Sequence, residues 1–441
     1  MCLESLFTHT NPEEIEVIVI DNGSTDDTVA HLTKESRIIF VANESNQGFA
    51  KACNQGAELA TGNEVLFLNN DTIVTKEWLT RMRKILDSDQ KIGLVGPMSN
   101  YVSGEQLIQD PYHSLEEIEA YVETRHKRFH EKKAYVMRLV GFCLLVRKKV
   151  LADIGGFDER FEIGSFEDDD FCLRAVQSGY RLAIALDVHV HHHGHATFTG
   201  SPEINFNQTY LDNYQRYVQK WGEDLSYFMH GRPELVQLVP QDAKQILDIG
   251  CGAGATGLQL INRQNSELVG VEGNEKMAQI ARSYYKAVYA INLDETVPPL
   301  KQESFDVILF ADILEHLKDP WKIVQQYAAF LKKGGAIIAS IPNIGHAEAL
   351  LPLLSGRFDY RDAGILDKTH LRFFTPQTLY TLFPTDQFSI RQQFSTHVPI
   401  DAKVSTFFNE VSLLGKKFDF DLDGLSDAIR TYQSVVLFKK L

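Results

Sequence analysis

The chain has 441 residues, more than one ordinary hydrophobic core accommodates, so we expect two or three domains and take two as the simplest case. Hydrophobic residues make up 44% of the chain and charged residues 23%, a composition typical of folded proteins and not of disordered ones. The formal net charge of −15 would repel a phosphate backbone, so we expect no nucleic-acid partner.

The sequence shows neither a membrane span nor an export signal. No apolar run approaches the ~20 residues that cross a bilayer, and the N-terminus has no basic segment followed by an apolar one. The five cysteines are odd in number, widely spaced and never in a C-x-x-C pair, which predicts reduced thiols and no zinc-thiolate site. We therefore expect a cytoplasmic protein without transmembrane segments, and peripheral association with a membrane stays open.

The first half alternates short β-branched runs with helical patterns. The runs at residues 16–21, 37–42 and 64–69 are apolar between their polar ends, as parallel strands buried on both faces are. Further strands follow in GFCLLVRKKV and RLAIALDVHV, and a helix at 207–221 closes the half. This order predicts a doubly wound α/β domain over residues 1–221.

A second alternation begins at QILDIGCGAGATG and continues with apolar runs at 267–272, 305–312 and 335–342. It predicts a second doubly wound α/β domain over residues 243–441. Residues 222–242, which contain two glycines and two prolines, are the predicted linker. Because this linker is short and not rich in Gly and Ser, we expect the two halves to pack against each other.

Polar residues follow several predicted strands of the first half. The first strand ends at Asp21, and the third ends at Asn69, Asn70 and Asp71. Ligands of parallel α/β sheets bind outside the carboxyl ends of the strands, so these side chains are candidates for a binding site. A simpler interpretation of Asp21 stays open, because with Ser24 it could form only a turn and a helix N-cap.

Two further polar runs stand later in the first half. The acidic run 167–170 opens a predicted helix, and four histidines lie between His189 and His193. Acidic residues at a helix start also favour the positive end of its dipole, so the acidic run could serve the helix alone. Carboxylates and imidazoles are, however, also the side chains that bind divalent cations.

Seven motifs follow one another in the first half: CLESL, EVIVIDNGSTDDT, NQGFAKACNQG, FLNNDT, GFCLLVRKKVLADIGGFDERF, FEDDDFCLR and HHHG. This order, over about residues 2–221, resembles family 2 glycosyltransferases of the GT-A fold, especially the rhamnosyltransferase-like members that build bacterial surface glycans. The resemblance implies inverting transfer of a sugar from a nucleotide-sugar donor to a glycan or a lipid-linked glycan precursor. It also implies a divalent cation, Mg²⁺ or Mn²⁺, that neutralises the departing diphosphate.

The resemblance assigns the donor and cation contacts to individual residues. Asp71 matches the carboxylate ligand of the cation, and His192 matches the histidine ligand, with His191 as the close alternative. Asn69 and Asn70 stand at the positions near the donor's ribose.

The same resemblance implies roles for three carboxylates. Asp21 matches the family's nucleobase-contacting aspartate. Asp168 matches the general base that takes the proton of the acceptor hydroxyl, and Glu167 would help to orient the acceptor.

The chain departs from this family at its start. Family members have an apolar strand just before the CLESL helix, and that strand lies inside the sheet and contacts the nucleobase. The present chain starts at Met1, within the helix. We therefore expect the neighbouring strands to expose unpaired backbone, and three explanations stay open: a start site placed too late, a fragment, or a domain that has lost donor binding.

The second half begins with a strand that runs into a glycine turn. Gly250, Gly252 and Gly254 let a ligand approach the backbone closely. The spacing of Gly252, Gly254 and Gly257 also satisfies G-x-G-x-x-G, and Glu272 lies 20 positions after Gly252. This spacing fits a dinucleotide or S-adenosylmethionine, because both offer a ribose diol to that carboxylate.

The motifs around the turn are more specific than its spacing. Asp248 before the glycines, VGVE, FDVILFADILEHL and FLKKGGAIIASIPN resemble class I S-adenosylmethionine-dependent methyltransferases, and GRFDYRDAGILDKTHLRFFT resembles a subgroup found with bacterial glycan-building enzymes. The resemblance covers about residues 232–400 and implies contacts to the methionine part, the ribose and the methyl donor. The implied cofactor-binding residues are Asp248, Gly250, Gly252, Gly254, Glu272 and Asp312, with Asp294 or Asn292 near the adenine.

A base for methyl transfer is harder to identify from the sequence. His316 lies four residues after Asp312, so the two would share one face of a helical turn, and a histidine can accept a hydroxyl proton near neutral pH. A packed or capping histidine is an equally good interpretation. His370 and Arg372 could contact an acceptor or serve the fold alone.

These observations predict a bifunctional enzyme that extends a bacterial surface glycan, or its lipid-linked precursor, and methylates a glycan hydroxyl. One alternative is an active methyltransferase that carries a catalytically inactive, glycosyltransferase-like glycan-binding module. Another is a nicotinamide-dependent oxidoreductase in the second half, which the glycine spacing also allows.

Overall fold

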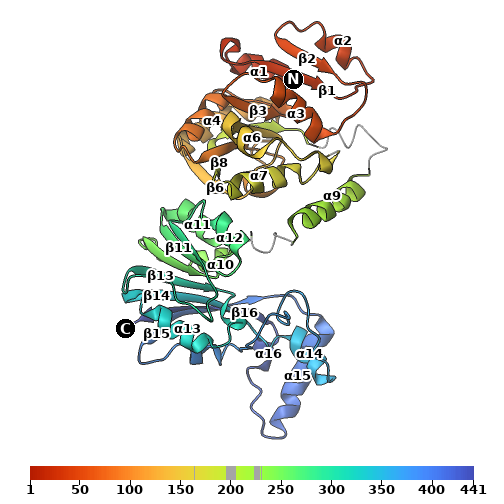
Figure 1. Cartoon of the computed structure of the whole chain (residues 1–441). Coiled ribbons are helices and arrows are strands. Elements are labelled where there is room, and N and C mark those ends of the chain that lie inside the picture. The colour runs from red at the N-terminus through yellow and green to blue at the C-terminus, as the bar shows by residue number, and fades with distance from the viewer. Residues whose placement is uncertain (163, 195–204, 223–228, 230) are drawn as a thin grey trace. The chain divides into compact units, whose positions relative to one another are not determined.

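The computed structural model divides the chain into two compact units, Met1–Tyr227 and Phe228–Leu441 (Figure 1). The division falls within the predicted linker at 222–242. Both units combine helices with sheets that contain parallel strands, which is the α/β class expected from the sequence. No helix of the described residues is long and apolar enough to cross a membrane. The described residues are 1–162, 164–194, 205–222, 229 and 231–441.

The first unit opens with a helix and a two-stranded parallel sheet. Strands β1 and β2 pair from Val17 with Ile38 to Asp21 with Ala42, and helix α3 packs on β1. The elements of this segment are α1 (Cys2–His9), β1 (Val17–Asp21), α2 (Thr28–Leu32), β2 (Ile38–Ala42) and α3 (Phe49–Leu59).

A five-stranded sheet forms the rest of the unit's framework, in the order β3-β7-β5-β8-β6. β5 and β8 run parallel, whereas β3 and β5 both run antiparallel to β7. The expectation that β3 continues one parallel sheet with the first two strands is therefore wrong, because β3 pairs with a strand much later in the chain. The strands are β3 (Glu64–Leu68), β7 (Cys143–Arg147), β5 (Ile92–Met98), β8 (Arg181–His189) and β6 (Lys133–Val136).

Helix α4 illustrates how the helices attach to this sheet. Trp78, Met82, Ile85 and Leu86 recur at helical spacing and are all buried, and the helix packs against β5 and β8. Two short strands, β4 (Thr72–Ile73) and β9 (His191–His192), pair antiparallel after the ends of β3 and β8. The larger helices after β3 are α4 (Trp78–Asp87), α5 (Ile118–Phe129), α6 (Lys148–Ile154), α7 (Glu167–Gln177) and α9 (Phe206–Trp221).

The second unit contains one seven-stranded sheet in the order β12-β11-β10-β13-β14-β16-β15. Its first five strands run parallel, and β16 runs antiparallel to both β14 and β15. The four predicted strands of this half are β10, β11, β13 and β14. The strands are β10 (Gln245–Ile249), β11 (Glu267–Glu272), β12 (Ala287–Ala290), β13 (Phe305–Ala311), β14 (Leu331–Pro342), β15 (Phe388–His397) and β16 (Thr431–Lys440).

The core of the second unit lies along the central strands. Leu247, Ile249, Ile308, Phe310 and Ile337 are fully buried there, as expected for parallel strands with both faces covered. Figure 1 shows α14, α15 and α16 gathered together to one side of the sheet. The helices are α10 (Pro233–Val236), α11 (Ala255–Gln264), α12 (Glu275–Ala281), α13 (Pro320–Ala328), α14 (Ala347–Leu354), α15 (Ala402–Lys416) and α16 (Leu425–Ala428).

Candidate functional site

A cavity of about 2590 Å³ lies between β1 and β3 in the first unit. β1 pairs only with β2 and β3 only with β7 among the described residues, so each strand presents one unpaired edge. The amino ends of both strands lie together, because Glu16 Oε1 accepts hydrogen bonds from the backbone N–H of Thr61 at 2.6 Å and of Gly62 at 2.9 Å. The expectation of unpaired backbone inside this sheet is thus confirmed.

The carboxyl ends of the strands open into the same cavity. All seven residues that the sequence proposed for the first half line it: Asp21, Asn69, Asn70, Asp71, Glu167, Asp168 and His192.

Asp71 and His192 face each other at 3.2 Å, between Asp71 Oδ1 and His192 Nε2. The pairing of β4 with β9 holds them there, with Thr72 opposite His192. The Nδ1 of His192 lies 2.7 Å from the carbonyl oxygen of Tyr101, to which it donates, so the lone pair of Nε2 points at the carboxylate. Two lone pairs at this separation need a proton or a cation between them, and the donor set fits a divalent cation.

The neighbouring His191 is held elsewhere. Its Nδ1 lies 2.5 Å from the hydroxyl of Tyr112, which also contacts His189, and burial lowers the pKa of His191 to about 4. Asp71 differs: burial would raise its pKa, but the hydrogen bond and charge of His192 outweigh burial and keep that pKa below its usual value. The geometry therefore places His192, rather than His191, beside Asp71.

Asp21 and the two asparagines lie at the strand ends. Asp21 is buried, and its Oδ2 accepts a hydrogen bond from the backbone N–H of Ser24 at 3.1 Å, so the turn role foreseen for this pair is present. The side chain of Asn69 is half-buried and that of Asn70 is exposed. The backbone carbonyl of Asn69 accepts the hydroxyl of Thr72 at 2.7 Å, which fixes the turn that follows β3.

The acidic run at the start of α7 divides into two roles. Asp168 accepts hydrogen bonds from the backbone N–H groups of Gly141 and Asp169, both at 2.9 Å, and Arg138 pairs with Asp169 at 2.6 Å. Burial and the charge of Asp168 raise the pKa of Glu167 to about 8. Arg138 was not predicted from the sequence, because only the fold brings the segment after β6 to α7.

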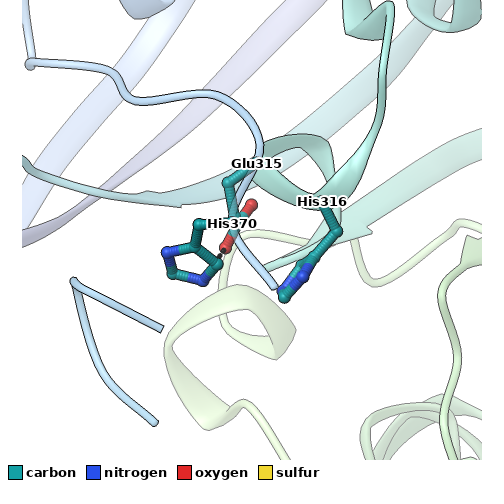
Figure 2. Close-up of side chains that lie close together, drawn as sticks. All are labelled: Glu315, His316 and His370. Atoms are coloured by element: carbon teal, nitrogen blue, oxygen red, sulfur yellow. Dashed lines mark ion pairs between the residues drawn. The ribbon is translucent and has the colours of Figure 1, made fainter. Parts of the chain in front are cut away.

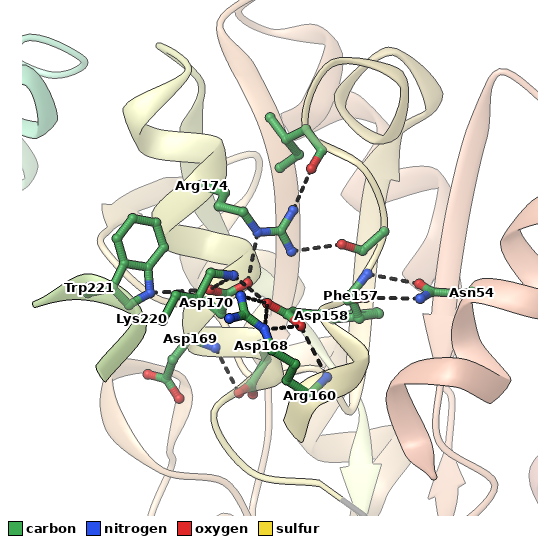
Figure 3. A network of polar contacts seen from close by, with 12 residues as sticks. Asn54, Phe157, Asp158, Arg160, Asp168, Asp169, Asp170, Arg174, Lys220 and Trp221 are labelled. Atoms are coloured by element: carbon green, nitrogen blue, oxygen red, sulfur yellow. Dashed lines mark hydrogen bonds and ion pairs between the residues drawn. The ribbon is translucent and has the colours of Figure 1, made fainter. Parts of the chain in front are cut away.

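Asp170 serves the fold alone, as one interpretation of the acidic run 167–170 allowed for all four residues. It is fully buried and pairs with Arg174 at 2.8 Å and with Lys220 at 2.5 Å, and Trp221 donates to it at 3.2 Å. Figure 3 shows Asp170 inside this network, which ties α9 to α7, with Asp168 and Asp169 nearby.

The glycine turn of the second unit joins β10 to α11. Gly250, Gly252 and Gly254 have φ values of 72°, 54° and 90°, a left-handed backbone that side chains with a Cβ rarely adopt. Glu272, at the end of β11, accepts the backbone N–H of Gly252 through Oε2 and that of Asn274 through Oε1, both at 2.8 Å. The carboxylate proposed for a ribose therefore lies against the glycine turn.

Asp248 lies beneath this turn and is only 1% exposed. Its Oδ2 accepts the hydroxyl of Tyr285 at 2.6 Å, and burial raises the pKa of Asp248 to about 6. A Cβ at Gly257 would lie 2.1 Å from that hydroxyl oxygen, so the third glycine of G-x-G-x-x-G makes room for a tyrosine. Tyr285, which follows α12, was not predicted from the sequence.

Two further residues that the sequence proposed for the cofactor, Asp294 and Asp312, follow strands β12 and β13. Asp312 has a φ of 52°, and its carboxylate accepts the hydroxyl of Ser340 at 2.8 Å and pairs with Arg232 at 2.5 Å. Asp294 accepts the backbone N–H of Lys318 at 3.0 Å.

The expectation that Asp312 and His316 share the face of one helical turn is wrong. The left-handed backbone at Asp312 precedes the turn, and only Leu314–His316 form a short 3-10 helix. His316 instead lies beside His370, with ring centroids 4.7 Å apart, and Glu315 completes the group (Figure 2). Arg372 is exposed and donates to the backbone carbonyl of Lys318.

Two family models match the two halves of the chain. Glycosyl transferase family 2 matches residues 1–155, and a methyltransferase domain matches residues 214–393.

Two curated relatives are methyltransferases by name. "Ubiquinone biosynthesis O-methyltransferase" of Bordetella avium (strain 197N) is 26% identical over 179 residues, which is 38% of this chain and 74% of the relative. The protein of the same name from Actinobacillus pleuropneumoniae serotype 5b is 26% identical over 156 residues, 32% of this chain and 66% of the relative. The names of these relatives describe methyl transfer and not the oxidoreductase activity that the glycine spacing also allowed.

Similar solved structures are a SAM-dependent methyltransferase from Archaeoglobus fulgidus (19% identity, 52% of this chain, 99% of that chain, TM-score 0.34) and one from Mesorhizobium loti (20% identity, 47% of this chain, 96% of that chain, TM-score 0.33). The chain therefore joins a domain that matches the glycosyl transferase family 2 model to a domain that matches a methyltransferase model.

Proposed function

We propose that the chain is a bifunctional transferase. Its first domain transfers a sugar, with inversion, from a nucleotide sugar to a bacterial surface glycan or lipid-linked precursor, and its second domain methylates a hydroxyl of that glycan. The proposed setting is the cytoplasm, where nucleotide sugars and S-adenosylmethionine are both available. The observation that carries the proposal is that the seven proposed residues, five from strand ends and two from the start of α7, line one cavity.

In the first domain, Asp71 and His192 would hold a divalent cation. When bound, that cation neutralises the charge that develops on the departing diphosphate. Asp21 is proposed for the nucleobase, and Asn69 and Asn70 for the donor's ribose. All five residues line the cavity between β1 and β3.

The acceptor side of the cavity would be formed by α7. Asp168 is the proposed base, and the two backbone N–H groups that it accepts hold its carboxylate toward the cavity. Because the pKa of Glu167 is raised to about 8, Glu167 is protonated at pH 7 and can donate a hydrogen bond to the acceptor. Asp168 would then take the proton of the attacking hydroxyl.

In the second domain, the glycine turn is the proposed site of S-adenosylmethionine. Asp248, Gly250, Gly252 and Gly254 are proposed for the methionine part, and Glu272 for the ribose hydroxyls. The left-handed glycines leave backbone in place of side chains at this point, which supports the assignment.

The remaining assignments of the second domain concern the adenine and the methyl group. Asp294 is proposed near the adenine, with Asn292 as the alternative, and Asp312 beside the methyl donor. His316 is the predicted base, and the lone pair of its Nε2 can take up a proton or bind an ion. The hydrogen bond of Nδ1 to Thr369, at 3.0 Å, leaves that Nε2 free.

The Asp248–Tyr285 contact leads to a pH-dependent prediction. Asp248 has a raised pKa of about 6, so we expect the affinity for S-adenosylhomocysteine to fall as the pH drops through this value. The hydrogen bond from Tyr285 lowers that pKa. In Tyr285→Phe the affinity for S-adenosylhomocysteine should therefore begin to fall at a higher pH, as calorimetric titration at several pH values would show. Tyr284→Phe, one position earlier, is the matched control. If the pH dependence of binding is unchanged in Tyr285→Phe, Tyr285 does not set the pKa of Asp248.

A second candidate function is favoured by the unpaired edges of β1 and β3. A first domain with this gap could bind a glycan without transferring a sugar, and the methyltransferase domain would then act on the bound glycan. Release of nucleoside diphosphate from a nucleotide sugar in the presence of Mn²⁺ separates the two candidates. The transferase requires this release, whereas saturable glycan binding without any turnover favours the binding module.

Thermal unfolding in the presence of UDP-, GDP- and dTDP-linked hexoses, each with and without Mn²⁺, identifies the donor. A ligand at 100 times its Kd adds about 2.7 kcal/mol to the free energy of unfolding. We expect one nucleotide class to protect the chain, and only with the cation. Protection by none of them would contradict donor binding.

A further inference from the structure

The second domain contains a cluster of metal-binding side chains outside the glycine turn. Glu315, His316 and His370 each offer one ligand atom, and these atoms all lie within 4.8 Å of one another (Figure 2). Glu315 and His316 end the short 3-10 helix after β13, and His370 comes from a segment more than 50 residues later. The backbone carbonyl of Glu315 fixes that segment by accepting the N–H groups of Leu371 at 2.8 Å and Arg372 at 3.0 Å.

Both histidines direct an unprotonated nitrogen into the cluster. The Nδ1 of His370 lies 3.0 Å from the carbonyl oxygen of Ile365 and donates to it, so the lone pair of Nε2 is free. The hydroxyl of Thr369 donates to Asp367 at 2.6 Å, so it accepts from the Nδ1 of His316 at 3.0 Å. Metal-binding histidines typically use such an outer hydrogen bond to fix the tautomer.

Glu315 lacks the partner that a buried carboxylate requires. It is 2% exposed, and neither of its carboxylate oxygens has a hydrogen-bond partner among the described residues. Its nearest basic neighbour is the Nε2 of His370, at 4.0 Å from Oε1. An unpartnered buried charge is costly, and a cation between the three side chains removes this cost.

We propose that Glu315, His316 and His370 bind a divalent transition-metal ion. Two imidazoles and one carboxylate suit Zn²⁺, Mn²⁺, Fe²⁺ or Co²⁺ better than Ca²⁺ or Mg²⁺, and three protein ligands leave a position for an exogenous oxygen. Ligand atoms at ~2.1 Å from a tetrahedral ion lie ~3.4 Å apart, so the three atoms draw in by about 1 Å on binding. If the proposed methyl transfer holds, that open position takes the acceptor hydroxyl and lowers its pKa.

Titration of the full chain with Co²⁺ tests this site without any substrate, so failure of methyl transfer would not affect the result. The titration uses the Asp71→Asn variant, which removes the other candidate cation site. We expect one Co²⁺ per chain, with the visible absorption of a low-coordinate site. Absence of this absorption in Asp71→Asn would overturn the proposal.

Three variants assign the bound ion to its ligands. Glu315→Gln and His370→Gln should each weaken Co²⁺ binding by roughly 100-fold, and Thr369→Val, which frees the ring of His316, by roughly tenfold. His397→Gln is the control for binding by an exposed histidine and should change nothing. Unchanged Co²⁺ affinity in both Glu315→Gln and His370→Gln would contradict the site. Two ligand variants are used so that the test still holds if one of them fails to fold.

Discussion

Gly252→Val is expected to abolish S-adenosylhomocysteine binding while the first domain keeps its ligand affinity. Gly252 has a φ of 54°, where a β-branched side chain is strained, and its N–H donates to Glu272 at 2.8 Å. A valine side chain would strain this turn and occupy the space that the proposed ligand needs. We expect the affinity to fall by at least roughly 100-fold, which corresponds to about 2.7 kcal/mol.

The control for Gly252→Val must separate backbone strain from loss of the ligand site. Gly356 also has a left-handed backbone, with a φ of 77°, and apart from its chain neighbours no atom of the described residues lies within 4 Å of a Cβ built there. Gly356→Val therefore carries similar strain, of about 1–3 kcal/mol, away from the turn. Calorimetry should show normal affinity in Gly356→Val and none in Gly252→Val. Normal affinity in a folded Gly252→Val protein would disprove the assignment of the turn.

Asp71→Ala is expected to remove the cation dependence of nucleotide-sugar binding and turnover. Asp71 supplies the carboxylate of the pair with His192, and its lowered pKa keeps it ionised at neutral pH. Without it, the imidazole alone would have to hold the cation against the donor diphosphate. We expect turnover to fall by roughly 10²- to 10³-fold, the range for loss of one charge-stabilising group.

Asp153→Ala is a suitable control for this variant. Asp153 pairs with Lys149 at 2.7 Å on the exposed surface of α6 and does not line the cavity. Turnover and Mn²⁺ dependence should be unchanged in Asp153→Ala. If Asp71→Ala also retained both, Asp71 would not belong to the cation site.

The sequence predicted those parts of the structure that depend on local signals. Apolar runs marked β10, β11, β13 and β14, because a strand buried on both faces must be largely apolar, whereas β1, which such a run also marked, is only half-buried. The polar residues that interrupt these runs marked the carboxyl ends of the strands, where side chains from separate strands meet. This pattern pointed to Asp21, Asn69, Asn70 and Asp71, whereas the roles of Glu167, Asp168 and His192 came from the family resemblance, and all seven line the first cavity.

The remaining features depend on contacts between distant segments. β3 pairs with β7 and not with the strands that precede it, and no local pattern encodes that choice. Arg138 reaches the acidic run, and Tyr285 reaches Asp248, only through the fold. The left-handed backbone at Asp312 also changes the direction of the chain before His316.

Glu315 and His370 are an intermediate case. Glu315 and His316 are adjacent in FADILEHL, directly after a predicted strand, and a third ligand in THLRFF was a candidate for acceptor contacts. The sequence therefore contained the residue types of a metal site. The sequence did not show that Glu315 and His370 lie close together, because this depends on the hydrogen bonds from the backbone N–H groups of Leu371 and Arg372 to the carbonyl of Glu315.

The proposed chain carries two separate ligand sites, one for a cation-bound diphosphate and one for a sulfonium nucleoside. Calorimetric titration with S-adenosylhomocysteine, and with the nucleoside diphosphate identified by thermal unfolding, tests both sites in the wild type, in Asp71→Ala and in Gly252→Val. We expect Asp71→Ala to lose only the Mn²⁺-dependent diphosphate site and Gly252→Val to lose only the S-adenosylhomocysteine site. Binding of neither ligand by the wild type, or loss of both sites in either folded variant, would contradict the two-site proposal.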